Sequence, residues 1–295
     1  MKVAIIGAGN VGAMTASRIV DDDLADVVLM DIVPGLAKGK ALDISDARPV
    51  TGSSAGIIGT ESSRDLKGSD IVVITAGLAR KPGMSRDDLL QKNAAILKDI
   101  SSQIKKYCGS AIVIVVTNPL DAMTYIVMKE TGIDPKKVIG MAGVLDSARF
   151  LNIASEKAKN VEQDKIFMMG SHGDSMVAIN RSKKLSDDIF SESSERARKR
   201  GAEIVEHLKT GSAYFSPSAS VFAMVRAVLK DEQKTLCASA YLEGQYGEND
   251  IYIGVPVKLG ASGVKEIIEI KLSGSEKAAF RNSAQSIRES IKKLT

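Results

Sequence analysis

The chain has 295 residues, of which 44% are hydrophobic and 26% are charged, and its formal net charge is +4. This composition is that of a soluble globular protein, long enough for one large or two ordinary domains. So small a net charge gives no reason to expect a nucleic-acid or membrane partner, although it would not repel an anionic substrate.

The sequence does not predict a membrane-spanning segment. The apolar run around Ile114 covers residues 111–116, far short of the roughly 20 residues that a membrane span requires. Residues 2–6 lead directly into a glycine motif, so we expect the start of the chain to belong to the fold. Cys108 and Cys237 lie far apart without metal-ligand spacing. We therefore expect two ordinary thiols in a reducing cytoplasm, with a disulfide as the weaker alternative and no metal site.

The first half of the chain alternates short β-branched runs with helical patterns. Runs typical of buried parallel strands occur at residues 3–6, 27–31, 71–75 and 111–116, and helical patterns at 11–24 and 87–106. Such alternation predicts a doubly wound parallel sheet, an α/β fold.

The second half has a different pattern. We expect a strand at residues 165–169, helices at 192–209 and 217–230, strands at 251–259 and 264–270 joined as a hairpin, and a closing amphipathic helix. This pattern predicts a C-terminal α+β substrate domain. We place the boundary near Met141, which gives domains 1–141 and 142–295. The basic run at residues 196–200 has no aromatic neighbours, so we interpret it as a solvated helix face.

A glycine motif follows the first predicted strand and opens a helix. Its residues, 7–12, read Gly-Ala-Gly-Asn-Val-Gly. In a Rossmann-type domain such glycines allow the tight turn, the approach of a pyrophosphate and the packing of helix on strand. Asp31 ends the second strand, 19 residues beyond Gly12. A carboxylate there accepts hydrogen bonds from a ribose 2′-OH and repels a 2′-phosphate, which favours NAD over NADP. The alternative for Asp31 is a strand-end turn residue.

Several motifs along nearly the whole chain resemble those of the lactate/malate dehydrogenase family, and more closely its lactate-dehydrogenase-like malate dehydrogenases. They occupy residues 76–86, 116–119, 140–149, 173–177, 211–215 and 244–247. The resemblance implies an NAD-dependent malate dehydrogenase that acts on a small dicarboxylate and forms a homodimer or homotetramer.

The resemblance also implies roles for particular residues. His172 would donate a proton to the substrate carbonyl, Asp146 would hold its imidazole, and Arg86 would polarise the carbonyl. Arg149 and Arg80 would bind the two substrate carboxylates, and Asn118 would contact both substrate and nicotinamide. The full predicted cofactor set is Gly7, Gly9, Asn10, Val11, Gly12, Asp31, Thr75, Ala76, Gly77, Asn93, Val116 and Asn118.

These roles agree with the chemistry of the residue types. Histidine titrates near neutral pH, and the planar fork of arginine suits carboxylates. Each residue also has an ordinary structural alternative: Asp146 and Arg149 are three apart and could be a surface helix pair, and Arg80 and Arg86 could belong to a polar turn. His172 could be a loop histidine bonded to backbone. For the second histidine, His207, we favour the structural role.

Three alternatives for the function remain open. A lactate or other monocarboxylate dehydrogenase differs at residue 80, where arginine suits a carboxylate. An NAD-dependent glycosidase would need a metal set with cysteine and histidine. A non-catalytic NAD-binding protein would not need His172, Asp146 and three arginines together. Ala213, where lactate-preferring members of the family usually have threonine, also favours malate as the substrate. The segment between Asp174 and Gly201 is shorter than the resemblance leads us to expect, which casts doubt on the strands after His172.

Overall fold

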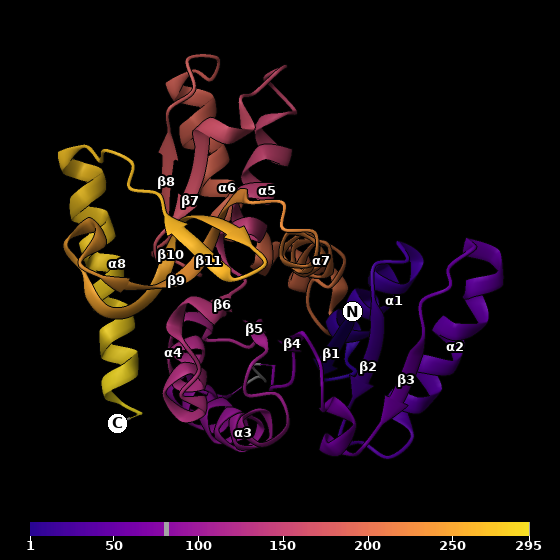
Figure 1. Ribbon diagram of the computed structural model, residues 1–295. Coiled ribbons are helices and arrows are strands. Elements are labelled where there is room, and N and C mark those ends of the chain that lie inside the picture. Colours follow the sequence, from indigo (N-terminus) through magenta and orange to yellow (C-terminus); the bar gives the residue numbers. More distant parts are fainter. Residues whose placement is uncertain (80–82, 295) are drawn as a thin grey trace.

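The structure, a computed structural model, describes residues 1–79 and 83–294. Figure 1 shows a central sheet with helices packed around it and a second, smaller sheet at one end. The strands are β1 (Lys2–Ile6), β2 (Asp26–Met30), β3 (Ile57–Thr60), β4 (Ile71–Ile74), β5 (Ile112–Val115), β6 (Val138–Gly140), β7 (Ile166–Met169), β8 (Val177–Asn180), β9 (Lys234–Glu243), β10 (Asn249–Gly260) and β11 (Gly263–Ile267). The α-helices are α1 (Asn10–Asp21), α2 (Leu36–Thr51), α3 (Arg86–Tyr107), α4 (Leu120–Thr131), α5 (Gly143–Ala154), α6 (Asp187–Leu208), α7 (Phe215–Leu229) and α8 (Gly274–Lys292).

The large sheet confirms the predicted doubly wound topology. Its order is β11-β10-β9-β6-β5-β4-β1-β2-β3, and the six strands from β6 to β3 run parallel. All residues of β4 and β5 are buried, as expected for strands covered by helices on both faces. The carboxyl ends of β1 and β4 therefore lie side by side at the point where the strand order reverses, which is where ligands bind in such sheets.

Within the described residues, β9, β10 and β11 of the second half extend this sheet, whereas β7 and β8 form the separate two-stranded sheet. β9 pairs antiparallel with β6 through Gly140 and Ser239, and β10 and β11 continue outward as antiparallel neighbours. The predicted hairpin at residues 260–263 is confirmed as the turn between β10 and β11. Because β9 covers the edge of β6, the parallel sheet has no open strand on that side.

The segment after His172 keeps its strand despite its short length. β8 pairs antiparallel with β7, and Arg181 at its exit binds Glu276 at the start of α8, with Nη–Oε distances of 2.9 and 2.7 Å. The doubt that the sequence cast on these strands is thereby answered. The helix predicted at 192–209 begins earlier, at Asp187, because the Ser186 side chain caps its first turn.

Other boundaries differ by a few residues from the predicted ones. α1 ends at Asp21, short of Leu24, and β11 ends at Ile267, short of Ile270. The basic run lies on α6, where Arg196 pairs with Glu156 and Lys199 with Glu195. These ion pairs, all partly exposed, agree with a solvated helix face. No helix in the described ranges is long and apolar enough to cross a membrane.

Candidate active site

The glycine motif forms the turn between β1 and α1 that the sequence predicts. A Cβ atom at Gly12 would collide with the carbonyl oxygen of Gly7, so the first turn of α1 packs against the end of β1 as closely as a glycine allows. Gly7 has φ of +109°, in the region that favours glycine. Gly9 and Asn10 are exposed at the start of α1, which has no side-chain cap and no acidic residue in its first turn. The N–H groups at this helix end are thus oriented to receive phosphates.

Asp31 follows β2 and turns its side chain back to the glycine turn. Its Oδ2 accepts a hydrogen bond from the Ala8 N–H at 2.6 Å, and its Oδ1 accepts one from Val33 at 2.9 Å. The carboxylate orders its own turn, as the alternative interpretation expects, and it also lies beside the glycine turn, where the prediction of a ribose-binding role places it. The glycine turn, the open helix end and this carboxylate fit a dinucleotide with free ribose hydroxyls.

A cavity of about 1020 Å³ extends from the glycine turn to His172. Among the predicted site residues it is lined by Val11, Thr75, Gly77, Val116, Asn118, Arg149 and His172. It is also lined by residues outside the predicted set of site residues, namely Met141, Leu145, Gly201, Val205, Lys209 and residues 211–213. Gly201 and Val205 lie four residues apart on α6, so one face of this helix follows the cavity, and Lys209 lies just beyond its end.

His172, which lines the cavity, pairs with the buried Asp146. The distance from His172 Nδ1 to Asp146 Oδ2 is 2.8 Å, and the two side chains are 16% and 3% exposed. Burial, the largest influence, lowers the pKa of His172, but the charge and hydrogen bond of Asp146 and the charge of Asp121 together raise it. A carboxylate bound at Nδ1 favours the tautomer that carries its proton there, which leaves Nε2 for an exchange of protons with a ligand.

The loop that carries His172 is fixed by hydrogen bonds from the backbone of residues 170–172. Gly170 exchanges N–H···O bonds with Gly254, at 2.8 and 2.9 Å. The Ser171 N–H donates to Ser283 Oγ at 2.6 Å, and the His172 N–H donates to Asp121 Oδ2 at 3.0 Å. Three successive residues are therefore bound to three different elements, and the imidazole is held in place by the fold as well as by Asp146.

Asp121 is a site-supporting residue that the sequence analysis missed. It is buried on α4, and its other oxygen accepts a hydrogen bond from Ser239 on β9 at 2.7 Å. Burial raises the pKa of this carboxyl group, against the opposing effects of the Ser239 and His172 hydrogen bonds. A signal was present, because an aspartate within the apolar run 120–128 needs a buried partner.

Arg149 extends from α5 into the same cavity. Its Nη1 lies 3.7 Å from Asp146 Oδ1, and its side chain is 13% exposed. Arg149 Nε and Asp146 Oδ1 are buried without a hydrogen-bond partner in the described ranges. Burial lowers the pKa of the Arg149 guanidinium, while the charge of Asp146 opposes that effect. A buried arginine with an unsatisfied donor beside a cavity is suited to an incoming carboxylate.

The remaining predicted residues occupy different positions. Arg86 begins α3 and pairs with Asp174 at 2.6 Å; both side chains are more than three-quarters exposed, and Arg86 does not line the cavity. Asn93 is fully buried, where it binds the backbone of Leu78 and Asn118 and so joins the segments after β4 and β5. Gly7, Gly9, Asn10, Gly12, Asp31 and Ala76 belong to the turn region beside the cavity. Arg80 lies outside the described residues.

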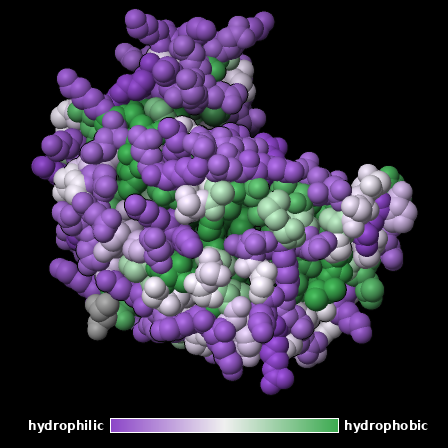
Figure 2. Space-filling model, in the orientation of Figure 1, coloured by the Kyte–Doolittle hydropathy of each residue, from purple (hydrophilic) through white to green (hydrophobic). Residues whose placement is uncertain are grey.

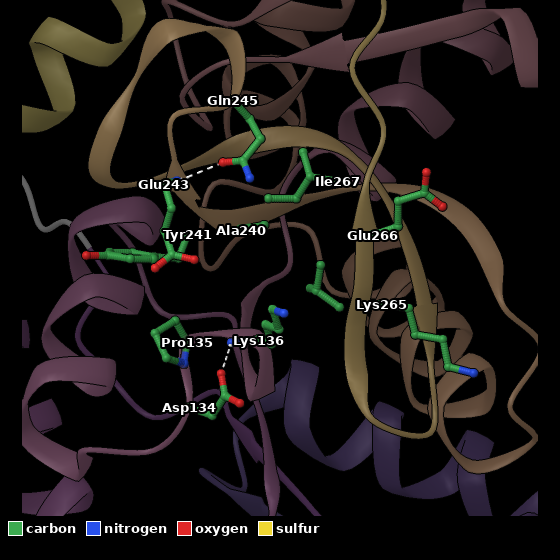
Figure 3. Close-up of a pocket in the computed structure, with 11 residues that line it drawn as sticks. Asp134, Pro135, Lys136, Ala240, Tyr241, Glu243, Gln245, Lys265, Glu266 and Ile267 are labelled. Carbon is green, nitrogen blue, oxygen red and sulfur yellow. Dashed lines mark hydrogen bonds between the residues drawn. The ribbon is translucent and has the colours of Figure 1, made fainter.

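A second, smaller cavity of about 310 Å³ lies between residues 134–136 and the strands β9 and β11 (Figure 3). In Figure 3 the charged ends of Lys265 and Glu266 point away from Pro135, and the drawn hydrogen bonds join Asp134 to the Lys136 N–H and Gln245 to the Glu243 N–H. No predicted site residue lines it. The described ranges contain no group of three or more His, Cys, Asp or Glu side chains suited to a metal, and both cysteines are buried thiols without a disulfide.

Comparison with known proteins agrees with this geometry. Residues 1–140 match the NAD binding domain of lactate/malate dehydrogenase, and residues 143–295 match the α/β C-terminal domain of the same family. The chain belongs to the lactate/malate dehydrogenase family, and its N-terminal half is an NAD-binding domain.

Among curated relatives, it is 47% identical to a malate dehydrogenase of Methanosarcina mazei, with 100% of this chain and 99% of that protein covered. It is 46% identical to one of Chloroherpeton thalassium, with 100% and 98% covered. Among solved structures, the malate dehydrogenase of Cryptosporidium parvum has a TM-score of 0.93 and 41% identity, with 99% of this chain and 98% of that chain covered.

Proposed function

We propose that this chain catalyses the NAD-dependent interconversion of malate and oxaloacetate. The observation that supports this best is the His172–Asp146 pair, 2.8 Å apart, beside Arg149 in a cavity that reaches the glycine turn. This arrangement combines a group that exchanges a proton, a group that binds a carboxylate, and a dinucleotide site within one enclosure.

Each residue has a separate role in the proposed reduction of a 2-keto acid. The bound dinucleotide supplies the hydride. Arg149 binds the carboxylate next to the keto group and so orients the carbonyl towards Nε2 of His172. His172 donates a proton to the oxygen as negative charge develops on it, and Asp146 stabilises the imidazolium before transfer. In the oxidation of malate, His172 accepts the proton from the hydroxyl group.

Arg86 and Arg80 complete the proposal. Arg86 would polarise the carbonyl. This role requires Arg86 to break its ion pair with Asp174 and move into the cavity. Breaking this exposed ion pair costs only about 0–1 kcal/mol. Arg80 would bind the distal carboxylate of a dicarboxylate, as the family resemblance implies. Asn118, which lines the cavity, would contact both the substrate and the nicotinamide.

The main alternative is a monocarboxylate dehydrogenase, since solved relatives of similar likeness include a lactate dehydrogenase from Cryptosporidium parvum (TM-score 0.92, 36% identity, with 99% of this chain and 96% of that chain covered). Oxidation of NADH with oxaloacetate and with pyruvate decides between them. If Arg80 binds the distal carboxylate, pyruvate leaves its guanidinium without a partner, so we expect kcat/KM for oxaloacetate to be higher by about 10⁴. Arg80→Gln should lower the oxaloacetate value steeply and raise the pyruvate value. Equal rates for the two substrates in the unmutated enzyme would contradict the assignment.

We further propose that the two functional parts divide near Met141 into domains 1–141 and 142–295, and that the protein works in the cytoplasm. Two buried, unbridged thiols support a reducing compartment.

We also propose that the protein forms a homodimer or homotetramer. Large apolar side chains that remain exposed, among them Val50 at 89% and Phe215 at 59%, support self-association. Figure 2 shows apolar surface over α7 and over the β2–β3 region.

A further inference from the structure

Ala8, in the glycine turn, is hydrogen-bonded to a carboxylate at its N–H and to an ammonium group at its carbonyl oxygen. The N–H of Ala8 donates to the Asp31 carboxylate at 2.6 Å, and the carbonyl oxygen of Ala8 accepts a hydrogen bond from Lys40 Nζ at 2.8 Å. Lys40 lies in the second turn of α2 and is half-buried, while Ala8 is fully buried. The ammonium group is therefore fixed at the turn, on the same residue whose N–H binds the Asp31 carboxylate.

Lys40 is also chemically unusual in its surroundings. Within residues 1–79 and 83–294 it is the cationic side chain that bonds to the glycine turn, and it has no carboxylate within ion-pair distance. The first turn of α1 contributes N–H groups and no charged side chain. The formal charges at the turn are thus one negative, from Asp31, and one positive, from Lys40.

A dinucleotide adds two negative charges from its phosphates to this turn. With Asp31 alone, the site would present a carboxylate to those phosphates, and like charges at such range repel. A half-buried ammonium group is less screened by salt than an exposed one, so it can offset this repulsion.

We propose that Lys40 is a cofactor-affinity residue, whose charge compensates Asp31 and attracts the diphosphate of the bound dinucleotide. This inference rests on the NAD-binding domain and is independent of which keto acid the enzyme reduces.

The competing explanation is that Lys40 merely joins α2 to the turn through its hydrogen bond to Ala8. The two explanations differ in their dependence on salt and on the charge of the ligand. A charge effect weakens as ionic strength rises and requires phosphates on the ligand, whereas a purely structural bond does neither.

The test is titration of the full-length protein with NADH by fluorescence, at about 20 and about 500 mM salt. Lys40→Met keeps the aliphatic stem and removes the charge, and we expect it to weaken NADH binding about three- to tenfold at low salt and by clearly less at high salt. Lys40→Arg should retain most of the affinity. Lys38→Met is the matched control, because Lys38 is an exposed lysine of the same helix, and it should bind like the unmutated protein.

ADP-ribose and adenosine separate the diphosphate from the rest of the cofactor. The loss in Lys40→Met should recur with ADP-ribose and be absent with adenosine, both measured by calorimetry. Unchanged NADH affinity in Lys40→Met would overturn the proposal. So would a loss that is equal at both salt concentrations, or equal for ADP-ribose and adenosine, since either result would indicate a structural bond. A melting temperature for each variant shows that the comparison is made between folded proteins.

Discussion

At the scale of single residues, the imidazole of His172 is the group on which the proposed chemistry depends. General acid catalysis is typically worth 10²–10⁴ in rate, so His172→Asn should lower kcat at least a hundredfold. Affinity for NADH should stay close to that of the unmutated enzyme, because His172 takes no part in the glycine turn. Steady-state kinetics and NADH titration measure the two effects separately. Turnover near that of the unmutated enzyme would remove His172 from the mechanism and direct attention to His207.

The pH dependence of the reaction tests the role of Asp146. Reduction of oxaloacetate needs protonated His172, whose pKa Asp146 helps to raise. Activity should therefore persist below that raised pKa and decline as the pH rises through it. Asp146→Asn removes the raising influence, so the decline in kcat/KM should move to lower pH, together with a lower maximum. An unmoved or upward-moved decline in the profile would show that Asp146 does not act through the protonation of His172.

Cofactor choice is the third property set by one side chain. Asp31 accepts the Ala8 N–H and lies at the end of β2, where a ribose hydroxyl would bind and a 2′-phosphate would be repelled. We expect kcat/KM with NADH to exceed that with NADPH by a wide margin. Asp31→Ser should narrow this margin, mostly by improving NADPH. If NADPH already equals NADH in the unmutated enzyme, the interpretation of Asp31 fails.

At the scale of elements, the pair between Arg181 and Glu276 anchors α8 to the end of β8. The Arg181 hydrogen bond, the largest influence, lowers the pKa of Glu276 to about 2 from its usual 4.5. The stabilisation is therefore complete above about pH 4.5 and is lost as the pH falls towards 2. Since the two side chains remain 33% and 19% exposed, solvent weakens the pair, and Glu276→Gln should lower the free energy of unfolding by about 1–2 kcal/mol at pH 7.

Urea denaturation at pH 7 and near pH 3 measures this difference, which should shrink at the lower pH. Glu266→Gln is a suitable control, because Glu266 pairs with Lys258 while 58% exposed and should change stability little. A difference between Glu276→Gln and the unmutated protein that grows as the pH falls would contradict the assignment.

The elements also show what a sequence can and cannot predict. Strands such as β4 and β5 were predictable because unbroken apolar, β-branched runs have few other uses. α2 was missed because it buries mainly Ala37 and Ala41, so it carries no strong apolar period. β9 pairs mainly with the next strand, β10, and at one position with β6. It was missed because its buried middle, Cys237 to Ala240, consists of small residues that are not typical of strands.

A distinction between local and tertiary signals applies to the residues of the site. The glycine turn, Asp31, Asp146, Arg149 and His172 were predictable because motifs specify them, and the distances among His172, Asp146 and Arg149 agree with their predicted roles. Asp121 and Lys40 were not identified, since each acts through a contact made by tertiary folding: Asp121 with the His172 backbone and Lys40 with Ala8. Their importance depends on which backbone groups they reach, which no spacing rule encodes.

At the scale of the whole molecule, the exposed apolar side chains predict self-association. Besides Val50 on α2 and Phe215 on α7, they include Leu42 and Leu208 at 57% and 45% exposure. Burying a large apolar side chain contributes about 1.5–3 kcal/mol, and a two-fold axis counts each residue twice. We therefore expect light scattering after size-exclusion chromatography to give a mass of two or four chains. Phe215→Asp or Leu42→Asp places a charge in such an interface and should shift the mass towards one chain, whereas Lys183→Asp, at an exposed polar position, should not. A single-chain mass for the unmutated protein at micromolar concentration would exclude the proposed oligomer and leave these apolar side chains without a partner copy.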